Sequence, residues 1–142
     1  MREIKTRTIK FRAWDSADKM MYCNIHDGIR FDDGSCYSFD KFLRNSVGDP
    51  DMDDYHKWSV MQYTGLKDSK GVEIYEGDIV NHWQEEMFFQ GNVVGLVVWQ
   101  PDTSCFEFEY SSTSQPFSNV DFNYIEPQII GNIYENPELV DE

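Results

Sequence analysis

The most informative absence in this 142-residue sequence is that of positive charge in its second half. All 12 lysines and arginines lie between Arg2 and Lys70, where 12 acidic side chains balance them. Residues 71–142 contain 14 acidic side chains and no basic one, so they carry the whole formal charge of −14. Because lysine and arginine neutralise the phosphates that a protein contacts, this half has nothing with which to hold a nucleic acid. We therefore do not expect direct nucleic-acid binding.

The amino-terminal basic cluster does not change this expectation. It consists of Arg2, Lys5, Arg7, Lys10 and Arg12. We interpret the cluster as part of a strand that pairs with the acidic half, either of the same chain or of another copy. Pairing between copies predicts homo-oligomers that loosen at high ionic strength.

Cysteine is scarce and long apolar runs are missing. Cys23, Cys36 and Cys105 are an odd number with no framework spacing, which favours buried free thiols in a reducing compartment. No apolar run is long enough to cross a bilayer, and the amino terminus lacks the pattern of a signal peptide. These absences predict a cytoplasmic protein that does not associate with membranes.

Motifs for catalysis and metal binding are also absent. The sequence has no Gly-x-Ser-x-Gly elbow, no phosphate-cradling glycine loop and no His-Glu-x-x-His. Cys23 and His26 have half of a zinc-site spacing that Cys36 could extend, but no second close pair completes four ligands. The acidic run "DPDMDD" lacks the glycine and distal glutamate of a calcium loop, so we interpret it as a solvated loop. We expect no catalytic residue, no cofactor and no metal.

What the sequence does have is aromatic residues, at 15%, set in short alternating runs. Alternation with a period of two is typical of half-buried strands, and aromatic side chains favour them. Glu107 and Glu109 alternate with Phe106 and Phe108 and should solvate an outer face. We expect strands in residues 9–14, 19–25, 29–31, 36–39, 58–66, 72–80, 92–99, 105–110 and 127–135.

Helix is expected only in two short pieces. Residues 39–46 place apolar side chains at helical spacing behind Asp40 as a possible cap, and residues 119–124 suggest one turn. Residues 111–118 are interpreted as a polar connector. The predicted fold is mainly β, a small, partly closed, SH3-like barrel with an additional amino-terminal β layer.

The predicted order along the chain has four parts that form one compact structural unit. They are an amino-terminal β layer with a short helix (1–48), an acidic loop (49–57), a barrel-like domain (58–135) and a frayed tail (136–142). Gly77 and Gly95 interrupt the strand patterns of the barrel-like domain, and we expect the sheet to bend or coil there. The stretch "YEGD" is therefore predicted to form a corner of the barrel.

One apolar cluster does not fit a core pattern. In "HWQEEMFFQG", Met87, Phe88 and Phe89 follow two glutamates in an expected hairpin connection, with Trp83 just before them. An apolar loop tip flanked by charge suggests contact with a partner or another subunit. A loop that folds back to cap the barrel is the alternative.

Three motifs in order resemble the YopX family of bacteriophage and prophage proteins, over Ile9 to Leu139. The matching positions are Phe11, Arg12, Ala13, Trp14 and Asp15, then Tyr63, Thr64, Gly65 and Leu66, then Tyr75, Glu76, Gly77 and Asp78, then Gly131, Asn132, Ile133 and Tyr134. The sequence departs from the family pattern in a short amino-terminal extension and in residues 87–90. The resemblance implies a mainly β fold and an origin in a phage or prophage genome, hence the cytoplasm of a bacterial host. It implies no activity, and the aromatic and glycine positions of the motifs fit an architectural role.

Together these observations predict a non-enzymatic accessory protein that binds another protein or assembles with itself. One alternative is an acidic nucleic-acid mimic that occupies a DNA- or RNA-binding host protein. A second alternative is a small-ligand-binding protein or an enzyme without a recognisable motif, which requires a concave pocket with converging polar groups.

Overall fold

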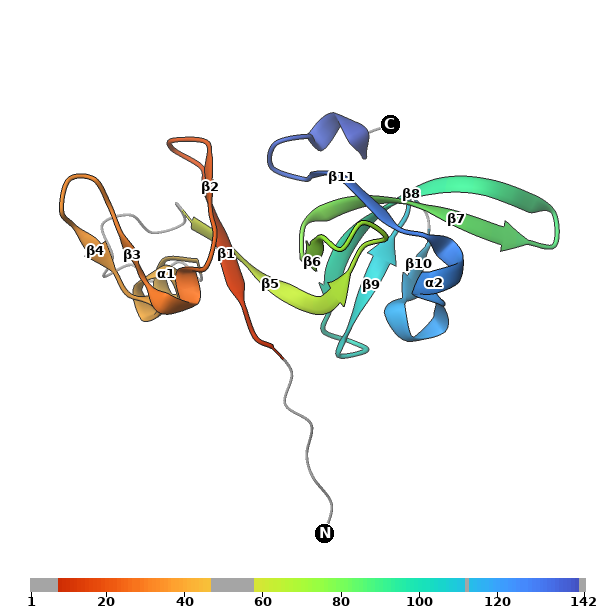
Figure 1. Ribbon diagram of the computed structural model, residues 1–142, viewed down its shortest axis with the longest axis horizontal. Coiled ribbons are helices and arrows are strands. Elements are labelled where there is room, and N and C mark those ends of the chain that lie inside the picture. Colours follow the sequence, from red (N-terminus) through yellow and green to blue (C-terminus); the bar gives the residue numbers. More distant parts are fainter. Residues whose placement is uncertain (1–7, 47–57, 112, 141–142) are drawn as a thin grey trace, which may run out of the picture. The chain divides into compact units, whose positions relative to one another are not determined.

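The computed structural model describes residues 8–46, 58–111 and 113–140 (Figure 1). The chain divides into two compact units, residues 1–63 and 64–142. The division falls inside strand β5 (Trp58–Lys67) and not in the acidic segment 49–57, which lies outside the described residues. One long strand therefore contributes residues to both units.

The first unit is built on a β-hairpin. Strand β1 pairs antiparallel with β2 on one side and with β5 on the other, so that Ala13 faces both Tyr22 and Val60. The Asp15 carboxylate closes the β1–β2 turn by accepting the backbone N–H groups of Ala17 and Asp18. The other elements are β1 (Phe11–Asp15), β2 (Met20–Tyr22), the 3-10 turn η1 (Ile25–Asp27), β3 (Ile29–Arg30), β4 (Cys36–Tyr37) and α1 (Phe39–Ser46).

Aromatic rings form the core of this unit. Ala13, Ile25, Phe42 and Trp58 are buried, and the rings of Phe42 and Trp58 meet edge to face with centroids 4.9 Å apart. Such edge contacts add to the stabilisation from burial. Partly buried hydrophobic residues surround them: Phe11, Tyr22, Ile29, Phe31, Tyr37, Phe39 and Val60.

Two expectations for the first unit are wrong. Cys23 and Cys36 are exposed, not buried. Helix α1 begins one residue earlier than its expected cap, and the hydroxyl of Ser38, not Asp40, accepts the N–H of Lys41.

The second unit contains a five-stranded antiparallel sheet of order β10-β9-β8-β7-β11. Strand β6 belongs to the four-stranded sheet β2-β1-β5-β6. The elements are β6 (Glu73–Tyr75), β7 (Asp78–Glu86), β8 (Phe89–Gln100), β9 (Cys105–Glu109), β10 (Ser114–Pro116), η2 (Phe117–Asn119), α2 (Phe122–Ile125), β11 (Gln128–Asn132) and η3 (Pro137–Leu139).

One face of this sheet holds the core. Val80, Val97 and Phe108 come from three neighbouring strands and pack with Ile74 and Ile125. The sheet curls into a half-barrel, so the predicted mainly β, partly closed fold with short helices is confirmed. None of the helices in residues 8–46, 58–111 and 113–140 has the length and hydrophobicity that a bilayer crossing requires.

The "YEGD" stretch forms the predicted corner. Gly77 has φ +86° between β6 and β7, a left-handed conformation that glycine adopts without steric cost. Its N–H donates to the carbonyl of Val97, its carbonyl accepts from Ile133, and the Asp78 carboxylate accepts the N–H of Tyr75. The corner therefore joins β6, β8 and the segment after β11.

At Gly95 the missing side chain makes room for a neighbour. A Cβ atom there would lie 3.0 Å from the Tyr110 ring and 3.1 Å from the Cβ of Phe108. These distances are shorter than ordinary van der Waals contact. The side chains of Phe108 and Tyr110 can therefore pack against β8 at this position only because residue 95 is glycine.

Three further expectations for the second unit differ from the structure. Glu107 is 4% exposed and not on a solvated face, because the turn before β9 places the Thr103 hydroxyl 3.1 Å from its carboxylate. The expected polar connector 111–118 contains strand β10, which pairs with β9. Pro137–Leu139, in the expected frayed tail, forms a 3-10 turn; residues 141–142 lie outside the described residues.

Candidate functional site

The β7–β8 hairpin ends in an exposed apolar tip. β7 ends at Glu86 and β8 begins at Phe89, so only Met87 and Phe88 connect them. Met87 is 88% exposed, Phe88 is 95% exposed and Phe89 is 46% exposed. Two-residue hairpin turns are normally made of glycine, asparagine or aspartate. Turn geometry therefore gives no reason for large apolar side chains at this position.

The hairpin is a regular ladder that holds its tip away from the sheet. The register runs without interruption from Ile79 opposite Leu96 to Glu86 opposite Phe89. At the base, β11 pairs with β7 only as far as Asn81, and β9 pairs with β8 only from Leu96. Figure 1 shows the distal half of the hairpin projecting beyond the other strands of this unit.

Side-chain contacts support the distal half of the ladder. The amide of Gln90 donates to Glu85 over 2.8 Å, and the amide of Gln84 donates to Glu86. The Tyr124 hydroxyl of α2 donates to Glu85, and this hydrogen bond raises the pKa of the Tyr124 hydroxyl. The two glutamates before the tip are therefore positioned on β7.

The four residues predicted to form an interaction surface do not all lie together. Met87, Phe88 and Phe89 form the tip, whereas Trp83 is half-buried and lines a hollow beside Asn92 and Tyr124 of the same unit. Four residues of strand separate Trp83 from Met87, which corresponds to roughly 13 Å. The structure places Met87 and Phe88 in solvent, and neither caps the barrel.

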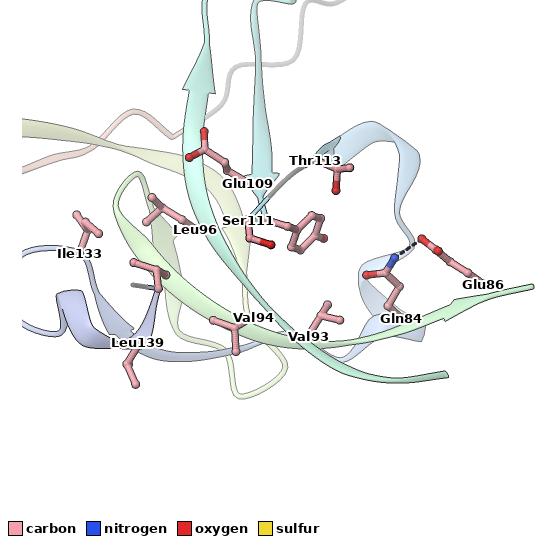
Figure 2. Close-up of a pocket in the computed structure, with 12 residues that line it drawn as sticks. Gln84, Glu86, Val93, Val94, Leu96, Glu109, Ser111, Thr113, Ile133 and Leu139 are labelled. Carbon is pink, nitrogen blue, oxygen red and sulfur yellow. Dashed lines mark hydrogen bonds between the residues drawn. The ribbon is translucent and has the colours of Figure 1, made fainter. Parts of the chain in front are cut away.

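Beside the hairpin, from Glu86 near its tip to Leu96 near its base, is a hollow of about 790 Å³ (Figure 2). Figure 2 shows the side chains of Val94, Leu96, Ile133 and Leu139 at one end, and the hydrogen-bonded pair of Gln84 and Glu86 at the other. The remaining lining residues are Val93, Glu109, Tyr110, Ser111, Thr113 and Val140. No single motif predicted this hollow, because its residues come from four separate segments of the chain.

A histidine–tyrosine pair lies between the hollow and the core. The His82 Nε2 atom is 2.7 Å from the Tyr110 hydroxyl, and its Nδ1 atom is 3.1 Å from the carbonyl oxygen of Trp83. Because a carbonyl can only accept, Nδ1 carries the proton and Nε2 accepts from Tyr110. The imidazole ring also packs on Phe108, with centroids 4.7 Å apart.

Burial controls the ionisation of this pair. Desolvation lowers the pKa of His82, against a smaller opposing effect of the Trp83 carbonyl. Desolvation and the nearby Glu86 charge raise the pKa of Tyr110 to about 12. Both side chains are therefore neutral at pH 7, and the Nε2 atom of His82 and the hydroxyl of Tyr110 are hydrogen-bonded to each other. The pair offers neither an activated nucleophile nor a base with a free lone pair.

The other sequence candidates are not brought together. His26 accepts the N–H of Phe11 through Nδ1 over 3.2 Å, while Cys23 and Cys36 are exposed. Across residues 8–46, 58–111 and 113–140, no group of three His, Cys, Asp or Glu side chains has an arrangement that could hold a metal ion. His56 and the acidic run 49–54 lie outside the described residues.

The polar family-motif positions make local structural contacts. The Asn132 side chain accepts the N–H groups of Tyr134 and Glu135 and so forms the turn after β11. A Cβ atom at Gly131 would lie 2.5 Å from the Oδ1 atom of Asn136, which leaves no space for a side chain there. Gly65, with φ +90°, needs glycine for its backbone conformation. Among the other motif positions, Phe11, Arg12, Trp14, Tyr63 and Tyr75 are buried or half-buried, whereas Leu66 is exposed.

Comparisons with known proteins give one family and two similar solved structures. The chain is similar over residues 10–141 to the family described as YopX protein. It is 27% identical to protein EF1440 from Enterococcus faecalis, with a TM-score of 0.62 over 96% of this chain and 100% of that one. It is 19% identical to protein yopX from Bacillus subtilis, with a TM-score of 0.53 over 93% of this chain and 98% of that one. A search of curated proteins finds no match. Because the family match spans nearly the whole sequence, the chain belongs to the YopX protein family.

Proposed function

We propose that this protein is a non-enzymatic accessory protein of a phage or prophage that acts by binding a protein through the tip of its β7–β8 hairpin. The observation that carries the proposal is the exposure of Met87 and Phe88, at 88% and 95%, at the end of a regular ladder. Large apolar side chains gathered at a projecting point favour contact with another protein surface. Aromatic side chains also contribute much of the free energy of such contacts.

The arrangement of polar groups supports a non-enzymatic role. His82 and Tyr110 lie between the hollow and the core, and burial shifts the pKa of each. Their hydrogen bond to each other leaves the Nε2 lone pair of His82 and the hydroxyl proton of Tyr110 already engaged. Their shifts follow from burial, and neither brings a reactive group to neutral pH. An enzyme would instead require a group with its pKa adjusted toward the working pH.

The proposal is tested with a tagged protein in host lysate, washed at low and at high salt and analysed by mass spectrometry. The tip variant is Met87→Ser combined with Phe88→Ser. The matched control is Met20→Ser, which removes a 51% exposed methionine from β2 in the other unit. We expect wild type and the control to retain the same protein and the tip variant to lose it roughly tenfold or more. Equal retention by all three would refute the proposal.

The same experiment separates the alternatives. A nucleic-acid mimic would retain a basic protein that high salt releases and that the tip variant still binds, because its contacts are carboxylates. Asp78 and Glu107 are only 2% and 4% exposed, so they do not belong to a phosphate-like face. A small-ligand-binding protein would use the hollow beside the hairpin and would retain no protein through the tip.

A further inference from the structure

We propose that the hollow beside the β7–β8 hairpin binds an organic cation, an ammonium or guanidinium group carried on a short aliphatic chain. Such a group occurs in free alkylamines and in the lysine and arginine side chains of proteins. The site is separate from the apolar tip, because neither Met87 nor Phe88 lines the hollow. The inference therefore goes beyond the proposed function and does not depend on it.

The hollow forms where strand β9 leaves the edge of β8. Pairing between these two strands stops at Leu96, and the chain then turns, with the N–H of Tyr110 donating to the carbonyl of Thr113. Neighbouring residues of a strand point to opposite faces, so a hollow lined by both Val93 and Val94 lies along the edge of the strand. Among the described strands, only β7 pairs with these two valines, and it does so from the other side. The space beside them is therefore open to a ligand.

The charged part of the lining is acidic and has no basic partner. The carboxylates of Glu86 and Glu109 line the hollow, and Glu86 accepts the side-chain amide of Gln84. Within the described part of the chain, no lysine or arginine lines the hollow, and residues 71–142 contain none in their sequence. Burial and, in addition, the Glu86 charge raise the pKa of the Tyr110 hydroxyl, so this charge acts on the wall of the hollow. The hollow therefore attracts a cation and repels an anion.

The aliphatic part of the lining favours a cation with an apolar chain. The side chains of Val94, Leu96, Ile133 and Leu139 lie together at one end of the hollow (Figure 2). Methylene groups packed against them would be removed from water, which adds to the attraction between the charges. A bare metal ion would gain nothing from these side chains, and it requires several close ligands. In the part of the chain that the structure describes, no three His, Cys, Asp or Glu side chains are arranged to supply them.

Neutral hydrogen-bonding groups between the two kinds of wall can orient the cation. Ser111 and Thr113 line the hollow, and their hydroxyl oxygens can accept N–H groups. An ammonium group has three donors and a guanidinium group has five, so either can use a carboxylate and a hydroxyl at the same time. The combination of carboxylates, hydroxyls and aliphatic side chains matches the chemistry of an alkylammonium or alkylguanidinium group.

The experiment titrates the full chain with three probes that share one aliphatic chain and differ in charge. Hexylamine is a cation at pH 7, hexanol is neutral and hexanoate is an anion. Backbone amide shifts in two-dimensional NMR spectra give both the dissociation constant and the place of binding. We expect saturable shifts at residues 93–96 and 109–113 with hexylamine, and roughly tenfold weaker binding of hexanol and hexanoate.

Charge-neutralising variants test the two carboxylates. Glu86→Gln and Glu109→Gln each keep the size of an exposed side chain and should weaken hexylamine binding roughly threefold, and the double variant roughly tenfold. Leu139→Ser, which removes part of the aliphatic wall, should weaken it by a similar factor. The matched control is Asp102→Asn, which removes one charge from an exposed turn outside the hollow and should leave the dissociation constant unchanged.

A second set of probes distinguishes the two sources of the cation. The tripeptides acetyl-Ala-Lys-Ala-amide and acetyl-Ala-Arg-Ala-amide carry the group as a protein would. If they bind at least as tightly as hexylamine, the cation is the side chain of a protein. If hexylamine binds roughly tenfold more tightly, it is a free alkylamine. Either result supports the cation site.

Three results would overturn the proposal. They are equal affinity for hexylamine and hexanol, unchanged hexylamine binding by the double glutamine variant, and no saturable shift in the hollow with any cationic probe up to about 50 mM. The tip variant, Met87→Ser with Phe88→Ser, should bind hexylamine as the wild-type protein does, because neither residue lines the hollow. A failure of the cation site and a failure of protein binding through the tip are therefore observed in separate assays.

Discussion

Replacement of His82 by glutamine should remove a defined part of the pH dependence of stability. His82 is 2% exposed, and desolvation holds its pKa below the ordinary value of about 6.5 that applies in the unfolded chain. The unfolded chain therefore binds more protons than the folded chain between these two pKa values. The contribution of His82 is fully present above pH 6.5 and is lost as the pH falls toward the folded pKa.

The size of the effect has a fixed upper limit. One proton taken up only on unfolding changes the free energy of unfolding by at most about 1.4 kcal/mol per pH unit. The wild-type protein should approach this slope below pH 6.5, because protonation of Nε2 would break the bond that it accepts from Tyr110 and charge a buried ring. His82→Gln should lack this slope.

The assay is urea unfolding of both proteins at pH 7.5, 6.5, 5.5 and 5.0, followed by tryptophan fluorescence. The difference in the free energy of unfolding between the two proteins removes the contributions of carboxylates and of the other two histidines, which both proteins share. A difference that stays constant from pH 7.5 to 5.0 would show that His82 titrates normally in the folded state and would refute the reasoning. Glutamine at this position should also cost stability at pH 7.5, since it does not reproduce both hydrogen bonds of the ring.

Two further predictions concern the architecture. Gly77→Ala should lower the free energy of unfolding by about 1–2 kcal/mol, because both backbone hydrogen bonds of the residue hold it at φ +86°, in the left-handed region that alanine disfavours. A free energy of unfolding within about 0.3 kcal/mol of the wild-type value would contradict this. Asp68→Ala should cost about 1–3 kcal/mol, because its carboxylate accepts the N–H groups of Lys70, Val72 and Ile129 and is 8% exposed. Asp102→Ala, which removes an exposed carboxylate from a turn, is the control and should leave the urea midpoint unchanged.

The local features of the fold could be predicted because short-range rules control them. The β1–β2 hairpin, the turn between β3 and β4 and the corner at Gly77 each depend on a few adjacent residues whose conformational preferences are strong. The short helices at residues 39–46 and near residues 119–124 were predicted from local spacing, although the cap expected for the first was wrong. Asp121 caps α2 by accepting the N–H of Asn123. The alternation of aromatic and acidic residues in β9 likewise predicted that Phe108 lies on the face of the strand that packs in the core.

The errors occurred where contact with another segment, and not the residue pattern of the element itself, decides the structure. Strand β10 is polar and ends in proline, so nothing local marks it as a strand, and it forms because β9 offers it an edge. Glu107 is buried because a turn folds over it. Leu139, expected in a frayed tail, lines the hollow beside the hairpin.

For the candidate site, too, one part could be predicted from the sequence and another part could not. The apolar cluster at Met87–Phe89 is visible in the sequence as a set of large apolar residues in an expected connection. The sequence could not decide between a projecting tip and a loop that caps the barrel, because the answer depends on the length of the ladder behind it. The structure decided this: eight residue pairs hold the strands together to the last residue before the turn. The hollow beside the hairpin arises only when residues from separate segments come together in three dimensions.

The sequence by itself determined the fold class, the corners, the asymmetry of charge and the family, because each of these depends on residue type and local order. Only the tertiary structure decided which acidic side chains are buried, which cysteines are exposed, and that the apolar tip projects at the end of a hairpin that borders a hollow. The physical reason is that burial and cavity shape are properties of packing between segments. A side chain's neighbours in space, rather than those in sequence, set its exposure and its partners.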